Sequence, residues 1–350
     1  MTVDDPAGLR AYILKRSVEL WCPFPVRRAS GDPRAEERLV SWIVDTGLAG
    51  PLTDEQRNRL PVVFAAYRLT EWRALNFPDV LERETQWLMD RWLGLGLVLE
   101  WILDQSVTAC PGQDESTWKL GEQLARLFRT GPGTGLLTPK AWAAAVTCTA
   151  ELLEETERRH GTEWRQEFGD AFARTVEASV LETTQNTLGR VTGLTPYLWL
   201  RPDSYGSLPH VLLALMSQGV HARARFLRHA CAAGAVRAAI LHNALVNDIL
   251  GYAKESVLEN LNGNAVLIVQ RQHGATLHEA VSTVIGMCNE QVRTLEHFAT
   301  LLRESAVGFP TGEQSAVAPF TEMLRSNVSG VIRWHLTAPQ YAAWTPEDHG

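Results

Sequence analysis

The chain has 350 residues, of which 45% are hydrophobic and 21% are charged, so it is long enough to bury a large core and too apolar for a disordered protein. Lysine and arginine number 33 and aspartate and glutamate 40, which gives a formal net charge of −7. This acidic balance argues against a general nucleic-acid binder and against a polybasic membrane-surface protein. The 12 tryptophans predict aromatic walls for any pocket.

Apolar residues recur at three- and four-residue spacing along most of the chain, which is the pattern of helices with one buried face. This periodicity predicts helices over residues 39–44, 81–103, 141–158, 164–188, 210–215, 222–259, 277–304 and 315–336. Alternating strand patterns are missing, and most of the Gly and Pro residues lie between these segments. We therefore expect one all-α domain over residues 1–350, a helical bundle with a central apolar cavity and with tails at about 1–14 and 342–350.

Neither the cysteine pattern nor the start of the chain indicates a secreted or membrane protein. The 5 cysteines are scattered and form no C-x-x-C pair, so we expect neither a disulfide framework nor a structural zinc site. The first residues lack the basic and apolar regions of a secretory signal. The most apolar run, residues 92–103, is interrupted by Glu100 and is too short to span a bilayer. These features predict a cytoplasmic protein without stable membrane insertion.

The strongest local signal lies in the long helical pattern around residue 250. Asn247, Gly251 and Glu255 are four residues apart in turn, so they share one helix face. Asn247 and Glu255 present oxygen atoms, which suit Mg²⁺, an ion that keeps several waters and bridges to phosphate. Lys254 adds a positive charge beside them. An ordinary solvated helix face would explain the same residues without any ligand.

A second signal is the pair Glu100 and Asp104, four residues apart in a very apolar helix. Two carboxylates at this spacing repel each other, and a divalent cation would compensate for the repulsion. The alternative is a helix end that reaches solvent, with both acids exposed.

Two further signals involve groups that suit phosphate. Arg201 lies where a helix is expected to break before it restarts near Leu208, and arginine is well shaped for phosphate. Tyr341, after Trp334, carries a hydroxyl that can donate to a phosphate oxygen. The alternatives are a surface arginine before a helix cap and a tail aromatic packed on the core.

In this order the motifs resemble those of microbial, bacterial-type class I terpene synthases. The segment from Asn247 to Glu255 resembles the second metal motif of that family, (N/D)D-x-x-(S/T)-x-x-K-E. Arg201 lies upstream at the spacing of the family's diphosphate-sensing arginine, and Ser204 and Tyr205 occupy the places of its linker and effector residues. Further resemblances extend the similarity to residues 22–25, 32–36, 76–79 and 264–281.

Three of the motifs differ from the family pattern. The Asp-rich first motif is replaced by Leu99-Glu100-Trp101-Ile102-Leu103-Asp104. If Glu100 takes the first acidic position, Trp101 replaces the second and Asp104 keeps the last; if Glu100 takes the second, Leu99 replaces the first. Gly251 replaces a hydroxyl ligand, whose place a water could take. The Arg-Tyr pair that follows Trp334 reads Gln340-Tyr341, so one diphosphate-binding cation is missing.

The resemblance implies a homodimeric terpene cyclase with three Mg²⁺ ions in each active site. It would ionise a linear C15 or C20 prenyl diphosphate and cyclise the carbocation in an aromatic-lined cavity. The metal ligands implied are Glu100, Asp104, Asn247, Gly251 through water, and Glu255. The diphosphate-binding residues implied are Arg201, Ser204, Lys254, Trp334, Gln340 and Tyr341. Catalytic roles are implied for Arg201, Tyr205, Lys254 and Tyr341.

The substituted motifs leave two alternatives open. The same scaffold can act on a cyclic or otherwise modified prenyl substrate, or it can be a catalytically inactive prenyl-binding or interaction protein. A chain-elongating prenyltransferase would have a similar helical fold, but it would carry two Asp-rich motifs, and this sequence has none.

Overall fold

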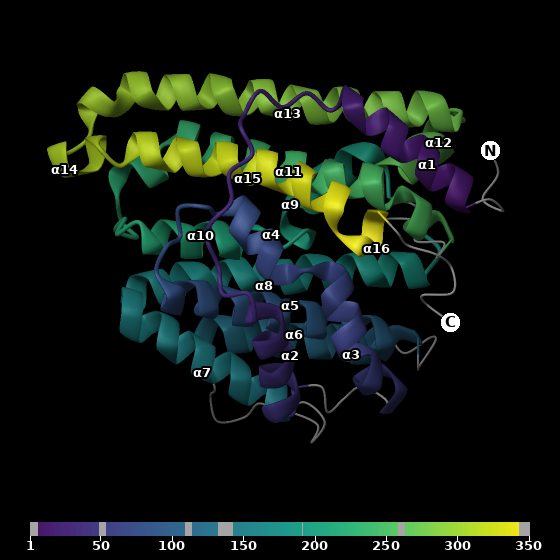
Figure 1. Cartoon of the computed structure of the whole chain (residues 1–350), viewed down its shortest axis with the longest axis horizontal. Coiled ribbons are helices and arrows are strands. Elements are labelled where there is room, and N and C mark those ends of the chain that lie inside the picture. Colours follow the sequence, from purple (N-terminus) through teal and green to yellow (C-terminus); the bar gives the residue numbers. More distant parts are fainter. Residues whose placement is uncertain are drawn as a thin grey trace.

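The computed structural model describes residues 6–48, 54–108, 114–131, 143–190, 192–257 and 263–342, and all regular structure in these ranges is helical (Figure 1). The α-helices are α1 (Pro6–Arg16), α2 (Ala35–Asp45), α3 (Asp54–Tyr67), α4 (Leu69–Asn76), α5 (Arg83–Thr108), α6 (Asp114–Thr130), α7 (Ala143–His160), α8 (Thr162–Thr187), α9 (Leu194–Ser204), α10 (Leu208–Ser217), α11 (Ala230–Val257), α12 (Ala265–His273), α13 (Leu277–Ser305), α14 (Thr311–Gln314), α15 (Val317–Thr337) and α16 (Pro339–Ala342). The predicted all-α class is confirmed. No helix in these ranges is both long and apolar enough to cross a membrane.

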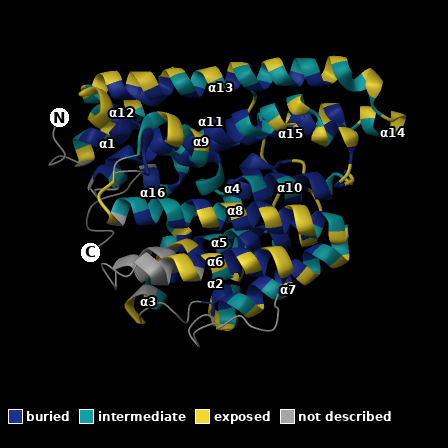
Figure 2. Ribbon diagram, turned by 180° about the vertical axis from the view of Figure 1, so that it is seen from behind, coloured by how far each residue is buried: buried dark blue, intermediate teal, exposed yellow. Residues whose placement is uncertain are grey.

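The long helices form two groups with short helices between them. In Figure 1, α11, α13 and α15 lie together on one side, and α5, α6, α7 and α8 lie on the other. Helix α4 packs on both α15 and α5, while α9 joins α8 to α11, so these short helices connect the two groups. Figure 2 shows α11 almost entirely buried and exposed residues along the outer face of α13. Residues that point inward from α11 therefore lie at the centre of the protein.

Aromatic side chains fill the core between α5, α6 and α8. The ring centroids of Trp92 and Phe168 are 4.6 Å apart, and those of Phe128 and Phe172 are 4.7 Å apart in a stacked arrangement. Each fully buried side chain of this size stabilises the fold by roughly 1.5–3 kcal/mol. Helices α6 and α8 approach closely because residue 169 is glycine: a Cβ there would lie 2.3 Å from the carbonyl oxygen of Phe128.

A chain of buried amides fixes α4, α15 and α11 relative to one another. Asn327 on α15 donates from Nδ2 to Oδ1 of Asn76 at 3.0 Å, and its own Oδ1 accepts from Nδ2 of Asn243 at 2.5 Å. All three side chains are buried. Buried amides with matched partners specify one arrangement, because any shift of a helix would leave them unsatisfied. This contact sets the position of the α11 segment that follows Asn243.

Several predicted boundaries differ from the structure. The helix expected over residues 222–259 begins only at Ala230, and a short 3₁₀ turn, Arg225–Arg228, precedes it. The carboxylate of Glu313 holds this turn by accepting the backbone N–H groups of Arg225 and Phe226 at 2.6 and 3.2 Å. Residues 6–16, most of which fall in the expected N-terminal tail, form α1, which buries Leu9 and Ile13.

Helices α3, α4, α6, α9 and α12 were not among the segments predicted from apolar spacing. Helix α3 contains Pro61, and α4 is short and follows Arg68, whose φ of 51° is left-handed. Asn264 precedes α12 and caps it, because its side chain accepts the N–H groups of Val266 and Leu267. The short helices α4 and α12 carry too few turns for a periodic pattern to stand out, and prolines obscure the pattern in α3 and α9. Helix α6 has 17 residues and an amphipathic sequence, so neither reason explains its omission.

Candidate active site

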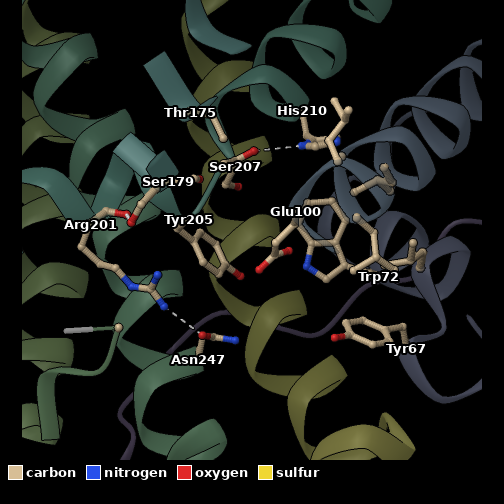
Figure 3. A pocket seen from close by; sticks show the side chains of 18 of the residues that line it. Tyr67, Trp72, Glu100, Thr175, Ser179, Arg201, Tyr205, Ser207, His210 and Asn247 are labelled. Atoms are coloured by element: carbon tan, nitrogen blue, oxygen red, sulfur yellow. Dashed lines mark hydrogen bonds between the residues drawn. The ribbon is translucent and has the colours of Figure 1, made fainter. Parts of the chain in front are cut away.

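A cavity of about 290 Å³ lies between the two groups of helices. Aromatic residues form much of its wall, as predicted: Tyr67, Trp72, Phe172, Tyr205, Trp334 and Tyr341. Charged residues also reach the cavity from α5, α8, α9 and α11: Glu100, Glu182, Arg201, Lys254 and Glu255. In Figure 3, Arg201 and Asn247 lie at one side of the cavity, and His210 and Trp72 lie at the other. The cavity therefore combines a charged region with an aromatic and aliphatic one.

Arg201 is buried rather than a surface arginine. The predicted helix break is present, because α9 ends at Ser204, Gly206 has a φ of 70°, and α10 starts at Leu208. Arg201 donates from Nη2 to Oδ1 of Asp248 at 2.8 Å and from Nε to the same oxygen at 3.2 Å. Burial opposes its charge, but the carboxylate of Asp248 raises the pKa of the guanidinium, so Arg201 stays charged.

Three of the five guanidinium protons of Arg201 are used within the fold. Besides the two bonds to Asp248, Nη2 donates to Oδ1 of Asn247 at 3.0 Å (Figure 3). The remaining nitrogen, Nη1, lies 3.9 Å from Oε2 of Glu182. The side chain is therefore held rigidly from behind, and Nη1, whose contact with Glu182 is too long for a hydrogen bond, can still donate to a ligand.

Asp248 was not among the predicted site residues, and it is the anchor of Arg201. Its side chain is fully buried and accepts from the hydroxyl of Tyr197 at 2.5 Å and from the backbone N–H of Ala265 at 3.1 Å. These bonds join α9, α11 and α12 at one carboxylate. The sequence signal was a lone acid within the most apolar part of α11, which is rare unless the charge is paired.

Asn247 connects the charged region to the C-terminal helices. Its Nδ2 donates to the hydroxyl of Tyr341 at 2.8 Å and lies 3.3 Å from Nε2 of His335. Burial lowers the pKa of His335 to about 3, so the ring is neutral. Its Nδ1 lies 2.9 Å from the carbonyl oxygen of Val331 and must be the protonated nitrogen, which leaves Nε2 as the acceptor. Tyr341 therefore lines the cavity and is no free tail aromatic.

Glu255 is turned back along α11 toward Gly251. Its Oε2 accepts from Nδ2 of Asn264 at 2.7 Å, and a Cβ on Gly251 would lie 2.9 Å from its Oε1. Burial, with the nearby charge of Asp248, raises the pKa of Glu255 to about 7. Burial alone would lower the pKa of Lys254, but Tyr67 and the carboxylates of Glu255 and Glu100 raise it. The glycine thus leaves room for the Glu255 carboxylate.

Carboxylates reach the cavity from α5 and α8 as well. The side chain of Glu100 is accessible from the cavity. Its surroundings in the protein interior raise its pKa, although the charges of Lys254 and Arg201 favour the ionised form. Glu182 was not predicted; burial raises its pKa too, although the charge of Arg201 favours the carboxylate. The side chain of Asp104 lies outside the described residues, so the structure does not test its predicted pairing with Glu100.

The remaining predicted residues divide into two groups. Ser204, Tyr205 and Trp334 line the cavity, but Nε1 of Trp334 donates to the carbonyl oxygen of Tyr67 at 2.9 Å and so has a structural partner already. Gln340 is buried outside the cavity lining, and neither of its amide atoms has a partner within the described ranges. The diphosphate-binding role predicted for Gln340 stays a prediction.

The available ligands fit a magnesium ion that completes its shell with phosphate and water. In the described part of the chain, no three His, Cys, Asp or Glu side chains lie close enough to hold a metal by themselves. Mg²⁺ usually takes one or two carboxylates from a protein and the other ligands from substrate phosphates and water. Asn247, Glu255 and Glu100 supply oxygen donors of this kind around one cavity.

Comparisons with known proteins identify the family of this chain. Residues 97–294 match the family described as terpene synthase family 2, C-terminal metal binding. The chain is 25% identical over 333 residues to (2Z,6E)-hedycaryol synthase of Kitasatospora setae, covering 93% of this chain and 92% of the relative. It is 25% identical over 346 residues to pentalenene synthase of Streptomyces exfoliatus, covering 94% of each chain.

A solved structure shares the fold. The linalool/nerolidol synthase from Streptomyces clavuligerus superposes with a TM-score of 0.72 at 16% identity, covering 90% of this chain and 99% of that one. The chain therefore belongs to terpene synthase family 2 as a bacterial-type class I terpene synthase, a carbon–oxygen lyase that acts on phosphates.

Proposed function

We propose that this chain is a terpene cyclase that ionises a linear C15 or C20 prenyl diphosphate and cyclises the resulting carbocation. The observation that carries the proposal is the held arginine: Asp248 and Asn247 fix Arg201 from behind while Nη1 is left for a ligand. A cation fixed in this way stabilises negative charge without reorganisation during the reaction. Lys254 reaches the same cavity and adds a second positive charge.

The residues divide the work between leaving group and hydrocarbon. Arg201 and Lys254 bind diphosphate oxygens, and the Tyr341 hydroxyl, held by Asn247, lies beside them. Asn247 and Glu255 would hold one Mg²⁺ with a water beside Gly251, and Glu100 with Asp104 would hold the others. When bound, Mg²⁺ supplies positive charge that stabilises the departing diphosphate.

The other side of the cavity suits an apolar chain and a cation. Leu93, Leu97 and Val176 exclude water from the hydrocarbon, and Trp72 and Phe172 present aromatic faces or edges to it. Aromatic faces stabilise a nearby cation by about 0.5–2 kcal/mol. The breaking of the carbon–oxygen bond near Arg201 would thus deliver the carbocation into a region that protects it from early quenching.

The direct test is product analysis of the purified chain. C10, C15 and C20 linear prenyl diphosphates are incubated with and without Mg²⁺, diphosphate release is followed, and extracts are examined by gas chromatography–mass spectrometry. We expect Mg²⁺-dependent release and a cyclic product from the C15 or the C20 substrate. The variant Glu255→Gln should lose ionisation while it stays folded, and Glu154→Gln, an exposed carboxylate on α7, is the matched control.

Other outcomes would support the alternatives. Turnover of cyclic diterpenyl diphosphates, with none of the linear ones, would show a modified-substrate enzyme. If calorimetry detects no Mg²⁺-dependent binding of any linear or cyclic prenyl diphosphate, the chain is a catalytically inactive scaffold. The homodimer that the resemblance implies stays a prediction, and light scattering after size-exclusion chromatography tests it.

A further inference from the structure

Two polar side chains stand apart from the charged region and face the cavity without a partner. Ser207 is 2% exposed and His210 is 6% exposed, and both line the cavity. In the described part of the chain, neither the Ser207 Oγ nor the His210 Nε2 has a hydrogen-bond partner. Buried polar atoms are almost always paired, so unpaired ones facing a cavity indicate a ligand. Figure 3 shows His210 on the side of the cavity away from Arg201 and Asn247.

The hydrogen bond between His210 and the backbone determines which of the two ring nitrogens carries the proton and which keeps a free lone pair. Nδ1 lies 3.3 Å from the carbonyl oxygen of Gly206, so Nδ1 carries the proton (Figure 3). Burial lowers the pKa of His210 to about 4, so the ring carries one proton only at neutral pH. Nε2 is therefore a bare acceptor, and the fixed Nδ1 bond orients it.

The surroundings of His210 suit a carbocation. The ring packs edge-on against Trp72, with centroids 5.4 Å apart, and against Phe172 at 6.4 Å. Both aromatic residues line the cavity. A cation stabilised by these rings would lie close to the His210 Nε2. The hydroxyl of Thr175, which lies near Ser207 and His210 in Figure 3, is satisfied within the fold, because it donates to the carbonyl oxygen of Ala171 at 3.2 Å.

Ser207 and His210 together match the needs of one water molecule. They are three residues apart at the start of α10, which places their side chains on one face. A buried water needs two to four polar partners. The Ser207 hydroxyl can donate a hydrogen bond to it or accept one from it, and the His210 Nε2 can accept one from it. We propose that Ser207 and His210 hold one water molecule and that His210 is the base for the addition of this water to the carbocation. This inference rests on the proposed cyclase function.

The step is balanced as an addition of water. A lone pair of the water oxygen forms a bond to the cationic carbon, one O–H bond breaks with its electrons kept by oxygen, and the proton goes to the His210 Nε2. The products are a terpene alcohol and an imidazolium. The imidazolium returns its proton to water when the cavity opens, since the buried ring favours its neutral form. His210 thereby sets the outcome as an alcohol, where loss of a proton from carbon would give a hydrocarbon.

The test compares product composition with ionisation. His210→Phe keeps an aromatic ring beside Trp72 and Phe172 and removes the lone pair, and Ser207→Ala removes the hydroxyl. Thr175→Val is the matched control, because the Thr175 hydroxyl is already satisfied within α8. Products formed in ¹⁸O-labelled water are measured beside diphosphate release. We expect a labelled alcohol from the wild type and Thr175→Val, and about 100-fold less alcohol relative to hydrocarbon from His210→Phe, with diphosphate release nearly unchanged.

An unchanged alcohol fraction in His210→Phe, or a wild-type product without oxygen from water, would overturn the inference. Absence of diphosphate release from the wild type would instead refute the cyclase proposal, on which this inference rests. A second test needs no turnover: a crystal structure should show an ordered water within hydrogen-bond distance of both the Ser207 Oγ and the His210 Nε2. A crystal structure without an ordered water at that point would refute the water site independently of the product analysis.

Discussion

Replacing Asp248 by asparagine tests whether this carboxylate holds the site together. Asp248 accepts from Arg201 on Oδ1 and from Tyr197 and the Ala265 N–H on Oδ2. Asparagine has one oxygen, so its amide nitrogen must face either Arg201 or the Ala265 N–H, and one donor then opposes another. The buried guanidinium also loses its counter-charge, and breaking a buried pair in this way costs about 3–5 kcal/mol.

The assay is urea unfolding at neutral pH, followed by circular dichroism. We expect Asp248→Asn to lower the unfolding midpoint by an amount equal to about 3–5 kcal/mol with an unchanged slope. The control is Asp203→Asn on α9, whose carboxylate lies 3.8 Å from Arg174 in a partly exposed pair and should change stability by less than about 1 kcal/mol.

A double variant separates the pair from its parts. If Arg201 and Asp248 stabilise each other, Arg201→Met should cost less in the Asp248→Asn background than alone, by about 0.5–3 kcal/mol. A loss below about 1 kcal/mol in Asp248→Asn, or strictly additive losses in the double variant, would refute the anchoring role.

Two further predictions concern packing and pH. A Cβ on Gly330 would lie 2.3 Å from the backbone oxygen of Leu75, so Gly330→Ala should lower the free energy of unfolding by about 1–3 kcal/mol, whereas Gly286→Ala, with open space around it on α13, should not lower it. Equal effects of the two changes in chemical denaturation would show that α4 and α15 are not in close contact. Burial lowers the pKa of His242 to about 4, so the unfolded chain takes up a proton there as pH falls below about 6.5 while the folded chain does not. Acidification from pH 7.5 to 5.5 therefore lowers the free energy of unfolding of the wild type through this histidine. The free energy of unfolding of His242→Gln should rise by about 1.4 kcal/mol relative to that of the wild type over the same range. A constant difference between the two proteins would contradict the buried neutral state of His242.

The sequence predicted the helical class and the position of Arg201, because both leave local patterns. Apolar spacing reports a buried helix face, and the interruption after Arg201 is visible as a change in that spacing. It did not predict Asp248 or Glu182 as partners of Arg201. Their contacts join α8, α9 and α11, and pairing between distant segments has no periodic signal in one sequence. The same reason applies to Gln340, whose burial depends on how α16 packs.

The glycine at position 251 shows how far a motif position can be interpreted from sequence. From the sequence, Gly251 is a missing ligand whose place a water can take. In the structure, the carboxylate of Glu255 also rests beside it, since a Cβ would come within 2.9 Å of Oε1. The substitution therefore changes where Glu255 rests as well as which ligands are present, and only the fold shows the second effect.

The balance of charge around the cavity predicts that diphosphate and Mg²⁺ bind together. Among the described residues that line it, Glu100, Glu182 and Glu255 face only Arg201 and Lys254. Glu255 is partly ionised at neutral pH, because its pKa is about 7. Asp248 already uses much of the charge of Arg201. A diphosphate therefore meets excess negative charge, and the repulsion between unit charges a few ångströms apart is several kcal/mol at the dielectric of a protein surface. Calorimetry with inorganic diphosphate should show no binding without Mg²⁺ and clear binding with it, and Glu182→Gln should permit measurable binding at lower Mg²⁺ because one negative charge is removed. Strong binding of diphosphate to the metal-free wild type would mean that Arg201 and Lys254 outweigh the carboxylates, and the proposed need for metal at this site would then be wrong.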